Sequence, residues 1–185
     1  MPEFKSVRGM RDLLVEETRQ LNFIIEKARE TAKSYVYGEV TTPIVELNEL
    51  LCAKTSDEFR KRMFTFKDLG NRTVSLRPEF TASIARLVTT VLKKNPKPIR
   101  VFSVGSVYRY DEPQRGRYRE FWQSNFELIG SNKPEADAEL ILITNNLLKK
   151  SGLKNYFFKV NHIGILKGIL DQEGITEQTQ TKILQ

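Results

Sequence analysis

The chain has 185 residues, with 39% apolar and 29% charged residues and a net charge of +7 at pH 7. This balance is typical of a globular domain with its own core, and the positive charge fits a polyanionic partner, although a solvated lysine-rich surface would give the same value. The single cysteine, Cys52, excludes an internal disulfide framework and suits a reducing cytoplasm, and the single histidine, His162, argues against a Cys/His metal site. No apolar run approaches the roughly 20 residues needed to cross a bilayer, which excludes a membrane-spanning protein.

Hydrophobic periodicity predicts the elements of the N-terminal half. Apolar residues at helical spacing indicate a helix over 15–36. A strand over 39–45 follows, and Pro43 inside it favours an edge strand or one at an interface, because proline donates no ladder hydrogen bond. The next expected elements are a helical turn over 47–51, a mobile loop or short helix over 53–62, strands over 63–67 and 73–77 joined as a hairpin, and a helix over 80–94.

Two long strands dominate the C-terminal half. They are expected over 99–110 and 120–130, followed by a helix over 134–150, a strand over 155–161 and a weakly patterned helical tail over 163–185. Because successive strands are joined by hairpin-like links, we expect an α+β fold with an antiparallel sheet flanked by helices. No glycine-rich phosphate loop follows a strand, so we expect neither a Rossmann nor a Walker-type nucleotide site.

The strand over 120–130 has one polar and one apolar face. Alternation places Trp122, Ser124, Phe126 and Leu128 on the face that should pack on helices. The other face is polar and carries Phe121, Gln123, Asn125 and Glu127. It indicates the floor of a ligand site, and the alternative is that this face simply meets solvent.

The loop between the two long strands carries four arginines and aromatic residues, so it can wrap a polyanion and stack a flat ring. Arg109 and Asp111 share a face where the first strand ends. Arg109 can hold a phosphate through two parallel hydrogen bonds, with Mg²⁺ on Asp111 beside it, or the two can form a surface ion pair.

A second candidate group lies at the end of the strand over 73–77. Alternation places Arg77 and Glu79 on one face, so Glu79 can join Gln123 and Glu127 in binding an ammonium group. The alternative is a structural Arg77–Glu79 ion pair. His162 lacks the partners of a catalytic histidine, and we interpret it as a packing residue.

Five segments, which follow the family's order along the chain, resemble the class II histidyl-tRNA synthetases of the archaeal type. The stretch from Tyr108 to Gln123, with its Glu-Pro-Gln-x-Gly-Arg-Tyr-Arg run, is similar to the family's motif 2, and 39–46 is similar to motif 1. The other three segments are Arg8-Gly9-Met10-Arg11-Asp12, Arg77-Pro78-Glu79-Phe80-Thr81, in which Phe80 replaces a usual glycine, and 136–140.

The resemblance implies a ligase that uses ATP and Mg²⁺ to convert L-histidine to histidyl-adenylate and then transfers the histidyl group to tRNA(His). It implies that Arg109 is catalytic and binds both the α-phosphate and the histidine carboxylate. Asp111 would assist ATP and Mg²⁺, Arg117 would bind the outer phosphates, and Phe121 would stack on the adenine.

The same resemblance assigns the histidine pocket. Glu79, Thr81 and Gln123 would hold the α-ammonium group, and Glu127 would bind the imidazole ring. Asn125 stands where a small residue is frequent in the family, so it should alter the shape of the pocket.

The family's motif 3, its later histidine-recognition element and its anticodon-binding domain are not matched in the 185 residues. We therefore expect a truncated catalytic core, with motifs 1 and 2 in 1–162 and the start of an insertion region or a tail in 163–185, and little or no activity from this piece alone. The resemblance also implies a cytoplasmic homodimer formed through the motif 1 region around Pro43. The alternatives are a synthetase-like regulatory subunit of ATP phosphoribosyltransferase and a non-catalytic dimerisation or RNA-binding fragment.

Overall fold

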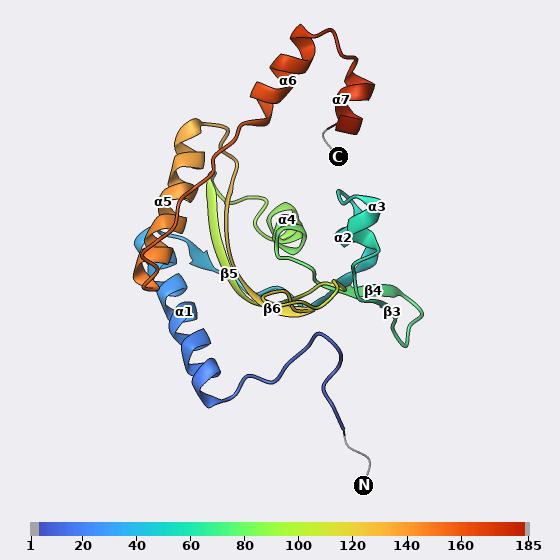
Figure 1. The fold of residues 1–185 in the computed structure, drawn as a ribbon, viewed down its shortest axis with the longest axis vertical. Helices are drawn as coiled ribbons and strands as arrows, with labels where there is room; N and C mark the ends of the chain where they lie inside the picture. Colours follow the sequence, from blue (N-terminus) through green and yellow to red (C-terminus); the bar gives the residue numbers. More distant parts are fainter. Residues whose placement is uncertain (1–3, 184–185) are drawn as a thin grey trace. The chain divides into compact units, whose positions relative to one another are not determined.

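Two long antiparallel strands form the centre of the computed structural model, which describes residues 4–183. β5 (Ile99–Tyr108) and β6 (Glu120–Ile129) pair along their whole length, from Ile99 opposite Ile129 to Tyr108 opposite Glu120. β1 (Gly38–Glu39) pairs with the other edge of β5 in parallel, which gives a mixed sheet of order β1-β5-β6 (Figure 1).

A second, smaller sheet is antiparallel and has the order β2-β4-β3. Its strands are β2 (Val45–Leu47), β3 (Thr65–Lys67) and β4 (Thr73–Leu76). The strands therefore form two sheets where the sequence suggested one. The expected strand over 39–45 is divided around Pro43 into β1 and β2, and each half lies at the edge of its sheet, where proline's missing N–H costs least.

Helices cover both faces of the larger sheet (Figure 1). α1 (Val15–Ser34) and α5 (Pro134–Lys150) bury Ala28 and Ile143 against Phe102 of β5. α4 (Thr81–Thr90) covers part of the opposite face and buries Ile84 against Val107. Side chains alternate along β5, so its two faces contribute to two separate hydrophobic clusters.

The predicted elements are largely present. The stretch over 53–62 contains a short helix, α3 (Asp57–Arg60), which follows α2 (Asn48–Cys52). The predicted strand over 155–161 is wrong: these residues adopt no regular structure, and Phe157 and Val160 are exposed. An isolated apolar run forms a strand only when another strand pairs with it.

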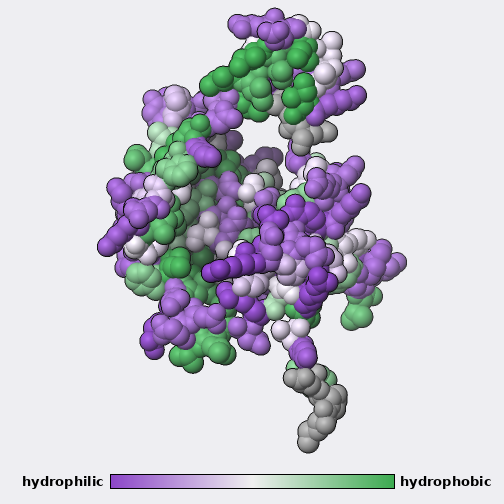
Figure 2. Space-filling view, in the orientation of Figure 1, coloured by the Kyte–Doolittle hydropathy of each residue, from purple (hydrophilic) through white to green (hydrophobic). Residues whose placement is uncertain are grey.

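The described residues divide after Gly152 into two compact units. The second unit contains α6 (Ile163–Gln172) and α7 (Glu177–Ile183), so the helical tail is confirmed within 163–183, and its last two residues lie outside the described residues. Figure 2 shows apolar side chains gathered over α6. No helix between residues 4 and 183 is long and apolar enough to span a bilayer.

Replacing Phe102 with alanine should lower the free energy of unfolding by about 3–5 kcal/mol, because its ring is fully buried at the centre of one cluster. Leu69→Ala is the control: Leu69 is fully exposed, and its change should stay within about 0.5 kcal/mol. Denaturant unfolding of both variants measures the difference. Equal effects would contradict the assigned core.

Candidate functional site

A polar cluster lies on the face of β6 that α4 covers. The Thr81 hydroxyl donates a hydrogen bond to Oε1 of Glu127 over 2.7 Å, and Nδ2 of Asn125 donates to the same oxygen over 3.1 Å. Oε1 of Gln123 is buried and accepts no hydrogen bond within residues 4–183. A buried acceptor without a donor is costly, so this face suits a ligand that brings N–H groups.

Two features of the sequence make room for this cluster. Thr81 is the first residue of α4, so its side chain stands at the helix end nearest Glu127. Gly105 lies opposite Gln123 on β5, and a Cβ atom there would stand 3.0 Å from Nη2 of Arg77 and 3.5 Å from the Phe80 ring. Glycine at this position therefore lets the buried guanidinium lie against the strand.

The Arg77 guanidinium connects the two sheets. It is 5% exposed, and it donates to the carbonyl oxygens of Thr42 (2.8 Å) and Ser106 (3.0 Å). Its carbon lies 4.3 Å from the centre of the Phe80 ring. Burial lowers the pKa of Arg77. The alternative Arg77–Glu79 ion pair is wrong, because carbonyl oxygens and not a carboxylate compensate this cation.

Arg109 follows β5 and lies at one end of the polar face. Its Nε donates to the Pro78 carbonyl oxygen over 3.0 Å. The guanidinium carbon lies 5.2 Å from the centre of the Phe121 ring and 5.5 Å from that of Phe59. The two Nη atoms of Arg109 donate no hydrogen bond to another described residue, so this end of the guanidinium can bind an anion.

Asp111 forms an ion pair where the sequence suggested a metal ligand. Arg62 donates to both of its carboxylate oxygens, with 2.7 Å from Nη2 to Oδ2, and Nε of Arg117 lies 4.0 Å from Oδ2. The hydrogen bonds from Arg62 lower the pKa of Asp111 against the opposing effect of burial.

This arrangement does not fit Mg²⁺. Both oxygens of Asp111 already accept hydrogen bonds from a cation, and its side chain is only 9% exposed. Within the described chain, no group of three or more His, Cys, Asp or Glu side chains could hold a metal ion. A magnesium site needs carboxylate oxygens that are free to coordinate.

Arg119 joins the loop to the N-terminal segment. It is 5% exposed, and its Nε donates to the Asp111 carbonyl oxygen over 3.0 Å. Its backbone N–H donates to the Gly9 carbonyl oxygen over 2.7 Å, and its Nη1 donates to that of Arg8 over 3.3 Å. An ion pair of 2.9 Å between Arg8 and Glu112 adds a second link. Residues about 100 positions apart are thereby held together.

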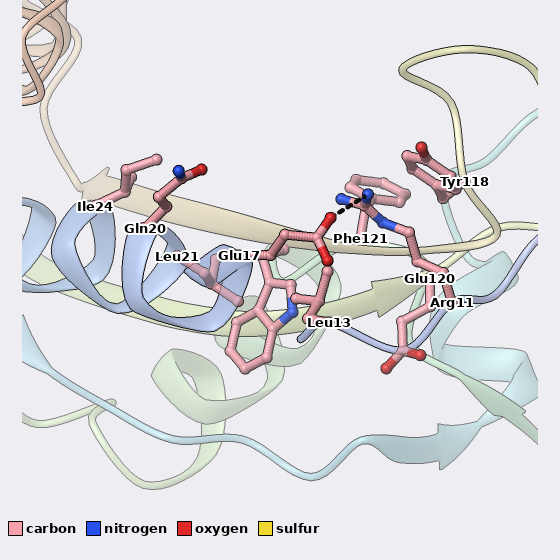
Figure 3. A pocket seen from close by; sticks show the side chains of 10 residues that line it. Arg11, Leu13, Glu17, Gln20, Leu21, Ile24, Tyr118, Glu120 and Phe121 are labelled. Carbon is pink, nitrogen blue, oxygen red and sulfur yellow. Dashed lines mark hydrogen bonds and ion pairs between the residues drawn. The ribbon is translucent and has the colours of Figure 1, made fainter. Parts of the chain in front are cut away.

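A pocket of about 480 Å³ lies between the start of α1 and the start of β6 (Figure 3). Arg11 pairs with Glu17 over 3.2 Å at its wall, and its guanidinium lies 4.3 Å from the centre of the Tyr118 ring. Two neighbouring residues of β6, Phe121 and Trp122, also line the pocket, and they lie on opposite faces of the strand. The pocket therefore reaches the polar face at Phe121.

The structure brings together most of the residues expected to form the site. Hydrogen bonds join Thr81 to Glu127, the Arg109 guanidinium stacks on Phe121, and Arg117 approaches Asp111. Glu79 makes no hydrogen bond or ion pair with another residue of 4–183, so its role stays a prediction. Sequence reasoning missed Phe59 and Arg62, and it did not pair Gly9 with Arg119, since no periodicity links positions so distant.

Solved structures define the class of protein to which this fold belongs. An ATP phosphoribosyltransferase regulatory subunit/histidyl-tRNA synthetase from Bacillus halodurans C is 30% identical, with a TM-score of 0.87 over 98% of this chain and 48% of the other. The apo histidyl-tRNA synthetase of S. aureus is 33% identical, with a TM-score of 0.70 over 82% of this chain and 36% of the other. The fold is that of a class II aminoacyl-tRNA synthetase catalytic domain.

Sequence comparison narrows the class to one family. The histidyl-tRNA synthetase family model matches residues 9–185. The histidine–tRNA ligase of Sulfolobus acidocaldarius is 46% identical over 185 residues, and that of Methanococcus vannielii is 41% identical over 180 residues. The chain belongs to the histidyl-tRNA synthetase family. It covers 43% of the length of each of these two relatives.

Gly9→Ala should destabilise the protein more than Gly152→Ala does. Both glycines have positive φ, +84° and +86°, so both substitutions carry a strain of about 1 kcal/mol. A Cβ atom at Gly9 would also stand 2.7 Å from Cγ of Arg119, whereas nothing lies within 4 Å of one at Gly152. Denaturant unfolding of the pair measures the difference, and equal losses would show that the Gly9–Arg119 contact tolerates a methyl group.

Proposed function

We propose that the chain is part of a histidine–tRNA ligase and supplies its ATP loop and one wall of its histidine pocket. One observation carries the proposal: Gln123 has a buried acceptor that no described residue bonds, on the same strand face as the Thr81–Glu127 hydrogen bond. The Arg109 guanidinium lies at the end of the neighbouring strand. These two features support a site for a cationic amine beside a site for an anion, as an amino acid and a nucleotide require.

Histidine would bind on the polar face. Gln123, Thr81 and Glu79 would hold the α-ammonium group, while Glu127 would accept a hydrogen bond from the imidazole ring. Glu127 is suited to this role because two donors fix the same carboxylate oxygen, Oε1, so its Oε2 stays open to a ligand. Asn125 is one of those donors, and it therefore shapes the pocket as well as the carboxylate.

ATP would bind along the loop. The Arg109 fork would hold the α-phosphate and the incoming carboxylate of histidine, Arg117 would neutralise the outer phosphates, and Phe121 would stack on the adenine. A carboxylate oxygen of histidine would attack the α-phosphorus, and the bond to pyrophosphate would break. Catalysis would then consist of positioning and charge stabilisation, with no covalent bond to the protein. Mg²⁺ enters this proposal only as a counter-ion of the ATP phosphates.

The adenylate would be consumed by a tRNA(His) 3′-terminal hydroxyl, and the positive net charge supports a polyanionic partner. The same proposal includes a cytoplasmic homodimer formed around Pro43. Three apolar residues that flank this proline, each more than 40% exposed, support such an interface: Ile44, Val45 and Leu47.

A second candidate is a regulatory subunit of ATP phosphoribosyltransferase, since the Bacillus halodurans relative is described both as such a subunit and as a histidyl-tRNA synthetase. Such a subunit would bind histidine without activating it. The Arg109–Phe121 contact and Arg117 favour the ligase, because a regulatory subunit does not need an ATP loop. Retained histidine binding without ATP binding would support the regulatory role.

Two substitutions should separate the two ligand sites. Arg109→Ala should weaken ATP binding roughly 10- to 100-fold and leave histidine binding nearly unchanged, because one charged fork is lost. Glu127→Gln should weaken histidine binding about tenfold and spare ATP. Calorimetric titration of each variant with each ligand provides the test.

Arg115→Ala is the control, since Arg115 is an exposed arginine of the same loop and forms no ion pair with other residues in 4–183. It should reduce ATP binding much less than Arg109→Ala does. If all three variants bind both ligands like the parent, the assignment of the two sites is wrong.

A further inference from the structure

The segment from Phe59 to Phe64, called here the brace, runs beside the residues that end β5. It begins in the last turn of α3 and leads to β3. The Phe59 ring lies 5.5 Å from the guanidinium carbon of Arg109. The Phe64 ring meets the Tyr110 ring edge-on, with 5.2 Å between ring centres. The two ends of the brace thus contact two successive residues of the loop.

Arg62, in the middle of the brace, makes the strongest contacts. Its carbonyl oxygen accepts a hydrogen bond of 2.7 Å from the Tyr110 N–H, and its guanidinium donates to both oxygens of Asp111. One residue therefore fixes both the backbone and a side chain of the loop. Because the Asp111 side chain is only 9% exposed, solvent competes weakly for this ion pair.

The brace holds the two residues that follow Arg109, because Arg62 bonds the Tyr110 N–H and the Asp111 carboxylate. The Arg109 guanidinium carbon itself lies 5.5 Å from the ring centre of Phe59, which belongs to the brace, and 5.2 Å from that of Phe121, which belongs to β6. Without the brace, Arg109 would keep its Nε bond to the Pro78 carbonyl oxygen, its backbone N–H bond to the Arg119 carbonyl oxygen and the contact of its guanidinium with the Phe121 ring. A long side chain with fewer contacts loses more conformational entropy when it binds a phosphate.

We propose that the brace holds the Arg109 guanidinium in the orientation that binds ATP. Arg62 is a positioning residue, and Asp111 is its ion-pair partner and not a metal ligand. The inference rests on the proposed function, because it takes ATP as the ligand of Arg109. It predicts that Arg62 influences ATP affinity without touching ATP, and that it does so through Asp111.

Arg62→Gln, Asp111→Asn and the double variant test the proposal by ATP and histidine titration. Each single change should raise the Kd for ATP about tenfold, and the double change should cost little more, because both remove the same interaction. The Kd for histidine should stay within about twofold. Arg62→Lys keeps the charge but not the planar fork, so it should restore ATP binding only in part.

Arg60→Gln is the matched control. It removes an arginine two positions away whose partners are Asp57 and the Cys52 carbonyl oxygen, neither of them in the loop. Its ATP affinity should equal that of the parent. Additive effects of Arg62→Gln and Asp111→Asn, or equal losses of ATP and histidine binding, would overturn the proposal.

Amide hydrogen exchange over 109–119 tests the brace independently of any ligand. Arg62→Gln should speed exchange in this stretch, whereas Arg60→Gln should not. If the parent chain binds no ATP but Arg62→Gln still frees the loop, the brace stands and the proposed ligand of Arg109 fails. If exchange is unchanged, the brace itself is refuted.

Discussion

The fold depends on a buried cation that has no carboxylate partner. Arg77 follows β4 of the smaller sheet, yet its guanidinium donates to carbonyl oxygens of β5 and of the stretch between β1 and β2. Its own backbone adds two more links: its N–H donates to the Ile44 carbonyl oxygen and its carbonyl oxygen accepts from the Tyr108 N–H. A charged group with these bonds can be buried, whereas without them it would cost several kcal/mol. The side chain and the backbone of Arg77 therefore both help to fix the relative position of the two sheets.

That position has a direct effect on the site. The next residue after Arg77, Pro78, supplies the carbonyl oxygen that holds Nε of Arg109, and three residues further on α4 begins with Thr81, the partner of Glu127. The proposed anion side and amine side of the site are thus both anchored to one short segment. The division of β6 into an apolar face for α1 and α5 and a polar face below α4 completes the arrangement, because it lets one strand serve the core and the ligand together.

Much of this could be read from the sequence. The two long strands, the helices on either side and the two faces of β6 follow from periodicities of 2.0 and 3.6 residues, which are local signals. Three features escaped because they depend on contacts between distant segments. The strand around Pro43 was divided between two sheets, 155–161 found no partner, and Asp111 was occupied by Arg62 from 49 positions away. Charge and spacing predicted that Asp111 meets a cation but not which cation.

The contacts of Arg119 with Arg8 and Gly9 join the N-terminal segment to the loop proposed to bind the nucleotide. Coupling between two segments is reciprocal. If the N-terminal segment stabilises the ordered loop by some free energy, the loop stabilises the ordered N-terminal segment by the same amount. A ligand that stiffens the loop therefore also stiffens residues about 100 positions earlier. Changes in the N-terminal segment, including an added tag, would then alter the binding constant of the proposed nucleotide site without touching the ligand.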